Sequence, residues 1–350
     1  MISELFVFAL AVMFALLFLW AFRTLPTEGW QILAAVPVSK DTGGAWKGLN
    51  LTYYGFFVAT ACAFSVIMIL VLMGSIRTPL FGTATVITTI LLVCLPASRI
   101  VAKIVERKRH TVTIGGASFI GILIAPPVVY LINAALASHS GITVPVLPLL
   151  GAIAIAYAFG EAVGRLACIS FGCCYGKSVS LCHPRLRNIF RRYYFVFTGE
   201  TKKVAYEGAM AGEPVVPIQA ITSLVFAVAG LAGTFLFLKA CWIAALVEPL
   251  VITQSWRVCS EMLRADYRGG GRISAYQIMA VLAIPYVGTI LPFFLSVNAP
   301  LPNIMAGLQA LLNPWVILTL EGLWSLVFLY LGRSMVTASR VSFHVVQERV

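Results

Sequence analysis

Charged residues are scarce in this sequence: they make up only 11% of its 350 residues, while 60% are hydrophobic. A soluble domain of this length carries about a quarter charged residues, so the composition excludes an ordinary soluble protein. No soluble domain is available to read a nucleic-acid groove, so the formal net charge of +12 does not indicate such a partner. The first apolar run, 2–22, lacks a basic leader and a small-residue cleavage site, which indicates a retained helix.

Long apolar runs dominate the chain instead. A run of about 20 apolar residues spans the roughly 30 Å of hydrocarbon in a bilayer. The sequence therefore predicts an all-α, polytopic membrane helical bundle. About nine transmembrane helices are expected, at 2–22, 53–74, 81–102, 115–137, 145–168, 217–238, 241–262, 275–296 and 312–332. The one long loop, 171–216, is basic and aromatic and is expected to form a small domain at the membrane surface.

The basic residues are divided unequally between the two ends of these helices. Twenty of the 25 lysines and arginines fall in alternate loops on one side, and only Arg77 and Lys239 fall on the other. The positive-inside rule then predicts an N-terminus outside the cell and a cytoplasmic C-terminus.

Ionisable residues inside the expected helices need a reason, since each costs about 2.5–3.5 kcal/mol at the centre of the bilayer. Glu161 and Arg165 are four residues apart on one helix, and Arg257 and Glu261 are four apart on another, so each pair shares a face. One interpretation is a polar cavity in which two arginines bind an anionic group such as a lipid phosphate. The alternative is two intrahelical ion pairs that hold the bundle together. A third arginine, Arg99, favours the first interpretation.

The segment 164–177 carries the densest group of chemically active residues. Its three cysteines are Cys168, Cys173 and Cys174. They allow three interpretations: a zinc or iron–sulfur site that also uses Cys182 and His183, redox or nucleophilic thiol chemistry, or packing in a tight turn. Thiol chemistry is favoured by Arg165 and Lys177, whose positive charge would lower a thiol pKa. No metal is expected, because adjacent cysteines rarely both reach one ion and no C-x-x-C pair is present.

Seven short stretches follow one another along the chain. They are Thr52-Tyr53-Tyr54-Gly55, Ser98-Arg99-Ile100, Gly115-Gly116-Ala117-Ser118-Phe119, the stretch from Gly164-Arg165 to Gly176-Lys177, Pro217-Ile218-Gln219, the run Arg257 to Glu261 and Arg264, and Gln277. Together, over about residues 50–297, they resemble the bacterial prolipoprotein diacylglyceryl transferase family. That family transfers a diacylglyceryl group from phosphatidylglycerol to the thiol of a lipobox cysteine and releases glycerol phosphate.

The resemblance implies a transferase-like membrane core at 50–297. An extra N-terminal helix and loop would occupy 1–49, and an extra C-terminal helix and basic tail would occupy 298–350. It also implies a place in the bacterial cytoplasmic (inner) membrane, an anionic glycerophospholipid as donor, a protein or small-molecule thiol as acceptor, and no cofactor. The residues expected to bind lipid or phosphate are Tyr54, Arg99, Gly115, Gly116, Glu161, Cys168, Gly176 and Gln277.

Catalysis is expected from Arg165, Arg257, Glu261 and Cys173. By resemblance, the two arginines would hold the departing phosphate, which is the main electrostatic demand of the substitution. Glu261 would orient Arg257. Cys173, with its thiol ionised beside Arg165, would act as a base or a transient nucleophile.

The sequence departs from the family on the side that activates the acceptor. Ile120 stands where the family has a histidine proposed to act as base, and Val216 replaces another histidine. Cys168 and Cys173 replace an asparagine and a glutamate. The extra first helix would also turn the signature toward the cytoplasm, whereas in the family it faces outside. The second expectation is therefore a catalytically silent protein that binds lipid or a partner on the same fold.

Overall fold

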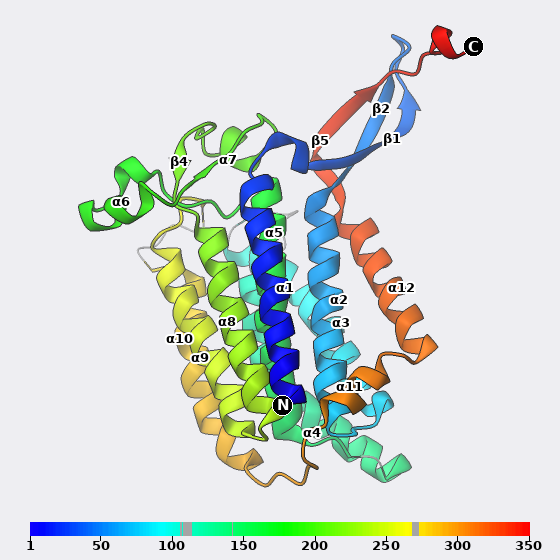
Figure 1. The fold of residues 1–350 in the computed structure, drawn as a ribbon, viewed down its shortest axis with the longest axis vertical. Coiled ribbons are helices and arrows are strands. Elements are labelled where there is room, and N and C mark those ends of the chain that lie inside the picture. The colour runs from blue at the N-terminus through cyan, green and yellow to red at the C-terminus, as the bar shows by residue number, and fades with distance from the viewer. Residues whose placement is uncertain (106, 108–113, 142, 268–272) are drawn as a thin grey trace.

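The computed structural model describes residues 1–105, 107, 114–141, 143–267 and 273–350. Most of these residues are helical, and nine long helices among them form a bundle (Figure 1). They are α1 (Ile2–Thr24), α2 (Tyr53–Ser75), α3 (Leu80–Val105), α4 (Ile114–Ser140), α5 (Val146–Phe171), α8 (Ile218–Leu238), α9 (Trp242–Glu261), α10 (Ala275–Ile290) and α12 (Pro314–Leu331). A 3-10 turn, η3 (Leu291–Phe294), continues α10. Each expected apolar span coincides with one of these helices.

Eight of these helices are long and apolar enough to cross a membrane, which confirms a polytopic membrane bundle. The helix outside this group is α9, which carries Glu248, Arg257 and Glu261. Ionisable residues of this kind lower the hydropathy of a helix. The expected number of nine spans stays a prediction.

Local signals fix several helix ends near the later site. Thr52 caps α2, because its hydroxyl accepts a hydrogen bond from the N–H of Gly55 at 3.4 Å. Ser274 and Gln277 form a capping box at the start of α10. α5 ends at Gly172, whose φ of 71° is left-handed and turns the chain out of the helix.

A three-stranded antiparallel sheet joins the two ends of the chain, which the expectation of an all-α protein missed. β1 (Ile32–Lys40) pairs with β2 (Trp46–Thr52), and β2 pairs with β5 (Arg333–Val341). The expectation failed because β2 and β5 lie at opposite ends of the sequence, so no local pattern indicates their pairing. β2 also crosses residue 49, where the N-terminal extension was expected to end.

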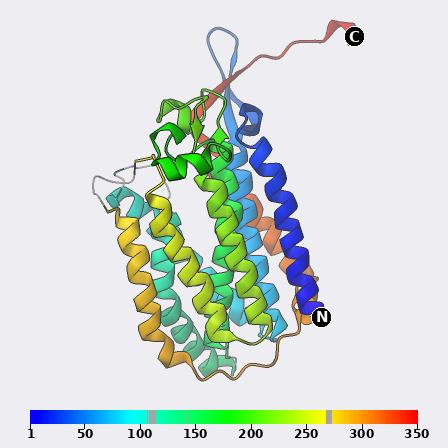
Figure 2. The ribbon, with the colours of Figure 1, turned by 60° about the vertical axis from the view of Figure 1, so that its left-hand side comes forward.

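The loop 171–216 folds into a small unit at the same end of the bundle as the sheet (Figures 1 and 2). Its elements are η2 (Val179–Leu181), α6 (Pro184–Phe190), β3 (Phe195–Val196), α7 (Lys203–Tyr206) and β4 (Pro214–Val215). The other short elements are η1 (Glu28–Trp30), α11 (Ile304–Ala310) and η4 (Gln347–Arg349). The C-terminus lies at this end and the N-terminus at the opposite one. The sheet, the loop unit and the C-terminus therefore lie at one end of the bundle.

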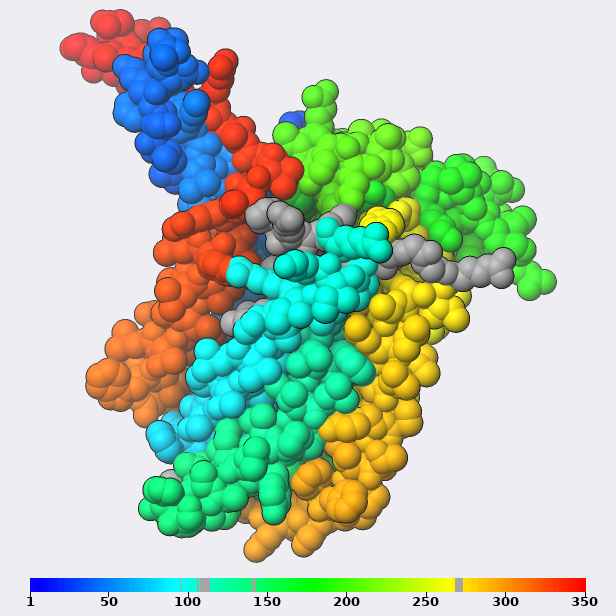
Figure 3. Space-filling model, turned by 180° about the vertical axis from the view of Figure 1, so that it is seen from behind, coloured from blue at the N-terminus to red at the C-terminus, as the bar shows by residue number. Residues whose placement is uncertain are grey.

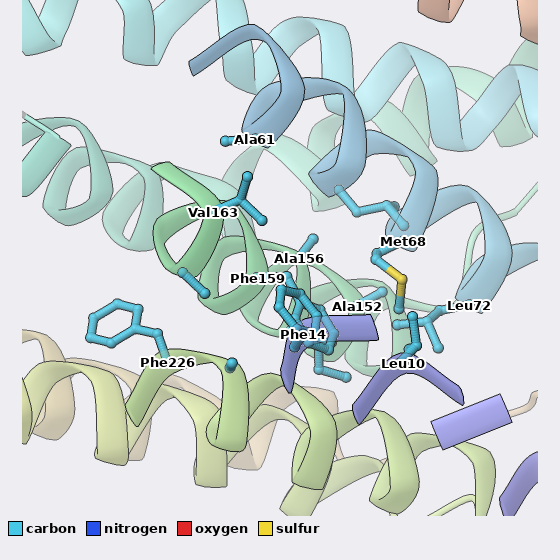
Figure 4. Packing of buried hydrophobic residues seen from close by; sticks show 14 of the residues in the cluster. Leu10, Phe14, Ala61, Met68, Leu72, Ala152, Ala156, Phe159, Val163 and Phe226 are labelled. Carbon is cyan, nitrogen blue, oxygen red and sulfur yellow. The ribbon is translucent and has the colours of Figure 1, made fainter. Parts of the chain in front are cut away.

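α5 is the central helix of the bundle and packs against α2, α8 and α9. α1 joins this core, since Phe14 stacks on Phe159 of α5 with ring centroids 5.2 Å apart (Figure 4). Most of α5 is buried, so its polar side chains face protein. α3, α4 and α10 lie together on the back of the molecule (Figure 3), where exposed apolar side chains such as Leu92, Leu131 and Val281 suit contact with lipid.

Candidate functional site

Three charged side chains meet inside the bundle between α5 and α9. The Glu161 side chain on α5 is only 2% exposed, and its Oε2 accepts a hydrogen bond from Nη2 of Arg165 at 2.6 Å. Its Oε1 lies 3.5 Å from Nη2 of Arg257 on α9. The spacing of Glu161 and Arg165 places them on one face, as expected from the sequence. One carboxylate thus pairs with two guanidinium groups, and we refer to these three residues as the charged centre.

Arg257 is enclosed by three helices. Its Nη2 donates a hydrogen bond to the hydroxyl of Tyr157 on α5. Gly115, at the start of α4, leaves the space that the guanidinium occupies, because a Cβ on this residue would lie only 2.7 Å from Nη1. The same Cβ would lie 2.9 Å from Cδ1 of the buried Tyr276, so a larger residue at this position would have to displace both side chains.

The charged centre has more hydrogen-bonding capacity than its own contacts use. The Nε atoms of Arg165 and Arg257 and Oε1 of Glu161 are buried and have no hydrogen-bond partner among the described residues. Buried polar atoms in proteins are nearly always bonded. Two guanidinium groups and one carboxylate also leave a net positive charge. The arrangement is suited to an additional anionic group.

A third arginine, Arg264, lies just beyond the end of α9. Its Nε and Nη2 donate to the two carboxylate oxygens of Asp266 at 2.8 and 2.7 Å, and its Nη1 lies 3.5 Å from Oε1 of Glu261. The expected pairing of Glu261 with Arg257 is thus replaced by a contact with Arg264. Glu261 is the last residue of α9, so the nearby turn brings Arg264 to it, while Arg257 faces α5.

A small polar cavity of about 10 Å³ lies beside Arg165. Arg264, Cys174, Gln219 and Ser260 contribute to its walls. This volume accommodates about one water molecule. The cavity connects the charged centre with the cysteines at the end of α5.

A much larger apolar chamber of about 320 Å³ lies within the bundle. Residues of α2, α3, α4, α5, α9 and α10 form its walls, among them Ile69, Ile122 and Leu250. Tyr157 also lines the chamber, and the same side chain accepts the hydrogen bond from Arg257. Tyr157 therefore lies between the charged centre and the apolar chamber and is in contact with both.

Three cysteines cluster where α5 ends. The Sγ atoms of Cys168, Cys173 and Cys174 all lie within 4.8 Å of one another. Hydrogen bonds with the other two thiols, together with burial, raise the pKa of Cys173 well above its usual value. The neighbouring thiols and burial thus favour the neutral form of Cys173, and the expected ionisation of this thiol beside Arg165 stays a prediction.

Two residues expected to bind lipid instead connect structural elements. Oε1 of Gln277 accepts the N–H of Ser274 at 2.9 Å, and its Nε2 donates to the carbonyl of Val258 at 3.1 Å. It therefore caps α10 and ties it to α9. Gly176 forms an isolated bridge with Arg264, which links the loop unit to the end of α9.

The remaining expected residues lie at different distances from the charged centre. Tyr54 of α2 is close to the thiols and packs edge-on against Phe171, with ring centroids 5.7 Å apart. Gly116 is buried on α4, next to Gly115. Arg99 is exposed on α3, where its guanidinium carbon lies 5.1 Å from the ring centroid of Tyr330 on α12. The structure thus gives Arg99 a different partner from that of Arg165 and Arg257.

Three residues complete the site, of which sequence reasoning singled out only Gln219, as part of a short motif and without a role in the site. Tyr157 lies four residues before Glu161, so the spacing that indicated Glu161 and Arg165 could also have indicated Tyr157. Gln219 of α8 donates from Nε2 to the carbonyl of Cys173 at 2.9 Å. Lys202 is fully buried in the loop unit. The contacts of Gln219 and Lys202 could not be predicted from local sequence, because their partners come from distant parts of the chain.

Lys202 holds the loop unit against the ends of α1 and α5. Its Nζ donates to the carbonyl oxygens of Ser170 at 2.6 Å and Leu25 at 3.1 Å. Burial lowers the pKa of this ammonium to about 7. The unit that covers the thiols is therefore anchored by a titratable group.

No family model matches this chain, and no curated protein matches it. The class of this protein therefore follows from its fold and its site. It is a multi-pass helical membrane protein whose buried charged centre lies between an apolar chamber and a group of thiols.

Proposed function

We propose that this protein binds an anionic glycerophospholipid such as phosphatidylglycerol inside its bundle and transfers a diacylglyceryl-type group to an acceptor. The observation that carries the proposal is that Tyr157 lines the apolar chamber and accepts a hydrogen bond from Arg257 of the charged centre. A glycerophospholipid has the same division, with a phosphate at one end and hydrocarbon at the other. Ligand sites commonly combine a mostly apolar wall with a few polar groups that fix orientation.

The phosphate would lie beside Arg165 and Arg257. Their planar guanidinium groups provide several donors at fixed angles, which suits phosphate oxygens. In the transfer, the acceptor atom would bond to the terminal glyceryl carbon while the bond from that carbon to the phosphate oxygen breaks. The departing oxygen keeps the electron pair, so the two arginines would stabilise the charge that develops on it.

The membrane setting is part of the same proposal. α9 would form a ninth span, since it packs between α8 and α10 and directs Arg257 toward α5. An ionisable residue is tolerated in a membrane when it faces the interior of the bundle and is paired. The resemblance to the prolipoprotein diacylglyceryl transferase family adds the bacterial inner membrane, and the distribution of basic residues adds a cytoplasmic C-terminus.

A catalytically silent lipid-binding protein is the second candidate. One observation favours it: Ile120 of α4 stands where the resembled family has a basic histidine, and its side chain cannot accept a proton. A protein of this kind would retain lipid in the chamber without releasing glycerol phosphate.

Lipid analysis tests the proposal. The purified chain should retain an anionic glycerophospholipid, identified by mass spectrometry of the extracted lipids. Arg165→Gln and Arg257→Gln should each lose most of it, whereas Arg340→Gln should retain it, because Arg340 is exposed on β5. Equal lipid content in all four proteins would contradict the proposed phosphate site.

Turnover separates the two candidates. The wild-type chain would be incubated with labelled phosphatidylglycerol and a cysteine peptide or a small thiol. Release of glycerol phosphate together with a lipid-modified thiol supports the transferase. Retained lipid without either product supports the silent binding protein.

A further inference from the structure

The thiol cluster has the dimensions of a metal site. In tetrahedral zinc coordination, a Zn–S bond of about 2.3 Å places the sulfur atoms roughly 3.8 Å from one another. The Sγ atoms of Cys168 and Cys174 are 3.8 Å apart, and Sγ of Cys173 lies within 4.8 Å of both. Small side-chain rotations would bring all three to a common ion.

The backbone explains how two adjacent cysteines reach one point. Gly172 and Cys174 both have left-handed conformations, with φ of 71° and 55°, and Cys173 lies between them. The N–H of Cys173 donates to the carbonyl of Cys168 at 3.1 Å, which folds the turn back onto α5. Gln219 holds the carbonyl of Cys173 from α8. Adjacent cysteines rarely both reach one ion, but the backbone of this turn allows Cys173 and Cys174 to do so.

We propose that Cys168, Cys173 and Cys174 bind one Zn²⁺ ion as thiolates and leave its fourth coordination position open. Thiolates are soft ligands that select zinc over Mg²⁺ or Ca²⁺. Three protein ligands with one open position are typical of catalytic zinc, whereas structural sites provide four. Binding releases the thiol protons to solvent, so the ion takes over the role that a neighbouring base would have.

The surroundings suit such an ion. Three thiolates and Zn²⁺ carry a net charge of −1, and the positively charged Arg165 shares the small polar cavity with Cys174. Cys168 is 5% exposed, while Cys173 and Cys174 are partly accessible beneath the loop unit. The ion would be shielded on the α5 side and reachable from the loop side.

The open position has a consequence for the acceptor, and this step alone rests on the proposed function. A thiol that coordinates zinc is deprotonated outright. An acceptor thiol bound there would attack the glyceryl carbon as a thiolate while the bond between that carbon and the phosphate oxygen breaks. The products are a thioether and glycerol phosphate, and the acceptor proton has already passed to solvent. Zinc would thus supply the activation that Ile120 cannot.

Metal analysis of the purified full-length chain tests the site without an activity assay. The wild type should contain one zinc ion per chain, and cobalt exchanged into it should show thiolate-to-metal charge-transfer absorption. Cys168→Ser, Cys173→Ser and Cys174→Ser should each lose most of the metal. Cys182→Ser is the matched control in the same loop, since its Sγ instead contacts the carbonyl of Ser178.

A measurement on the wild type keeps the test valid if a serine variant fails to fold. Maleimide labelling mapped by mass spectrometry should modify the three clustered thiols only after a chelator removes zinc. The exposed Cys241 and Cys259 should react equally before and after chelation. Labelling that does not depend on zinc, a disulfide within the cluster of the purified protein, or full zinc content in the three variants would each overturn the proposal.

Failure of the zinc site and failure of the lipid site give different results. Arg257→Gln should lose lipid and keep zinc. Among the described residues, the side chain of Arg257 pairs with Tyr157 and Glu161 and with none of the three thiols. A protein without zinc that still retains lipid would overturn the metal site and leave the proposed lipid binding intact.

Discussion

Replacing Glu161 by Gln tests whether one carboxylate compensates both arginines. The change preserves the shape of the side chain and removes its charge, which lies 2.6 Å from Arg165 and 3.5 Å from Arg257. The side chains of Arg165 and Arg257 are only 13% and 9% exposed, so solvent cannot replace the lost partner. Breaking a buried ion pair by removing one partner costs about 3–5 kcal/mol.

The expected loss is large enough to measure as a thermal shift. Each kcal/mol moves the unfolding midpoint of a chain of 150–250 residues by about 2–4 °C, and that of a longer chain by less. The midpoint of Glu161→Gln in neutral detergent should therefore fall by roughly 5–10 °C. Glu4→Gln is the control, because its ion pair with Lys239 at 2.7 Å is solvent-exposed and should leave the midpoint unchanged.

Anionic lipid provides the decisive comparison. The variant retains two guanidinium groups without a carboxylate, so phosphatidylglycerol should raise its midpoint more than that of the wild type. Phosphatidylcholine should raise it less, since its choline partly cancels the phosphate charge. An unchanged midpoint in Glu161→Gln, or equal stabilisation of both proteins by phosphatidylglycerol, would refute the idea that Glu161 neutralises an anion site.

Three further predictions concern packing, pH and topology. Gly115→Ala should destabilise the protein by about 1–3 kcal/mol and reduce lipid retention, because the new Cβ would lie 2.7 Å from Nη1 of Arg257, whereas Gly288→Ala on α10 meets open space and should be tolerated. Burial lowers the pKa of Lys202 from 10.5 to about 7, so the unfolded state binds more protons between these values. Wild-type stability should therefore rise between pH 7 and 10, by at most about 1.4 kcal/mol per pH unit, and thermal unfolding of Lys202→Met should lack this contribution. Alkaline phosphatase fused after Val350 or inserted after residue 203 should be inactive if the basic end is cytoplasmic; activity at either position would contradict the proposed orientation.

The helices were predictable because the signal for them is local. A run of about 20 apolar residues has few alternatives in a bilayer, and each expected span coincides with a helix. The sheet was not predictable, because β2 obtains its second partner from β5 near the other end of the chain. The hairpin of β1 and β2 has a local signal in its glycine-containing connection, 41–45, whereas nothing within the segment 333–341 indicates its partner.

In the site, contacts within one helix were predictable, and contacts between different elements were not. Helical spacing correctly joined Glu161 with Arg165, because both lie on one helix. The partner of Arg257 depends on how α9 packs against α5, which spacing along α9 does not contain. The cysteines depend on backbone conformation: only the left-handed turn at Gly172 and Cys174 shows that adjacent thiols can meet.

The contacts also bear on whether these charges merely hold the bundle together. Two intrahelical pairs would have neutralised each arginine on its own helix, yet Arg165 and Arg257 share Glu161, and Glu261 contacts Arg264. A continuous series of contacts results. The apolar chamber meets Tyr157, Tyr157 meets Arg257, and Arg165 shares a cavity with Cys174 beneath the loop unit. Transfer from a lipid to a thiol needs a hydrocarbon site, a phosphate site and a thiol site in this order, and helix adhesion alone requires none of them.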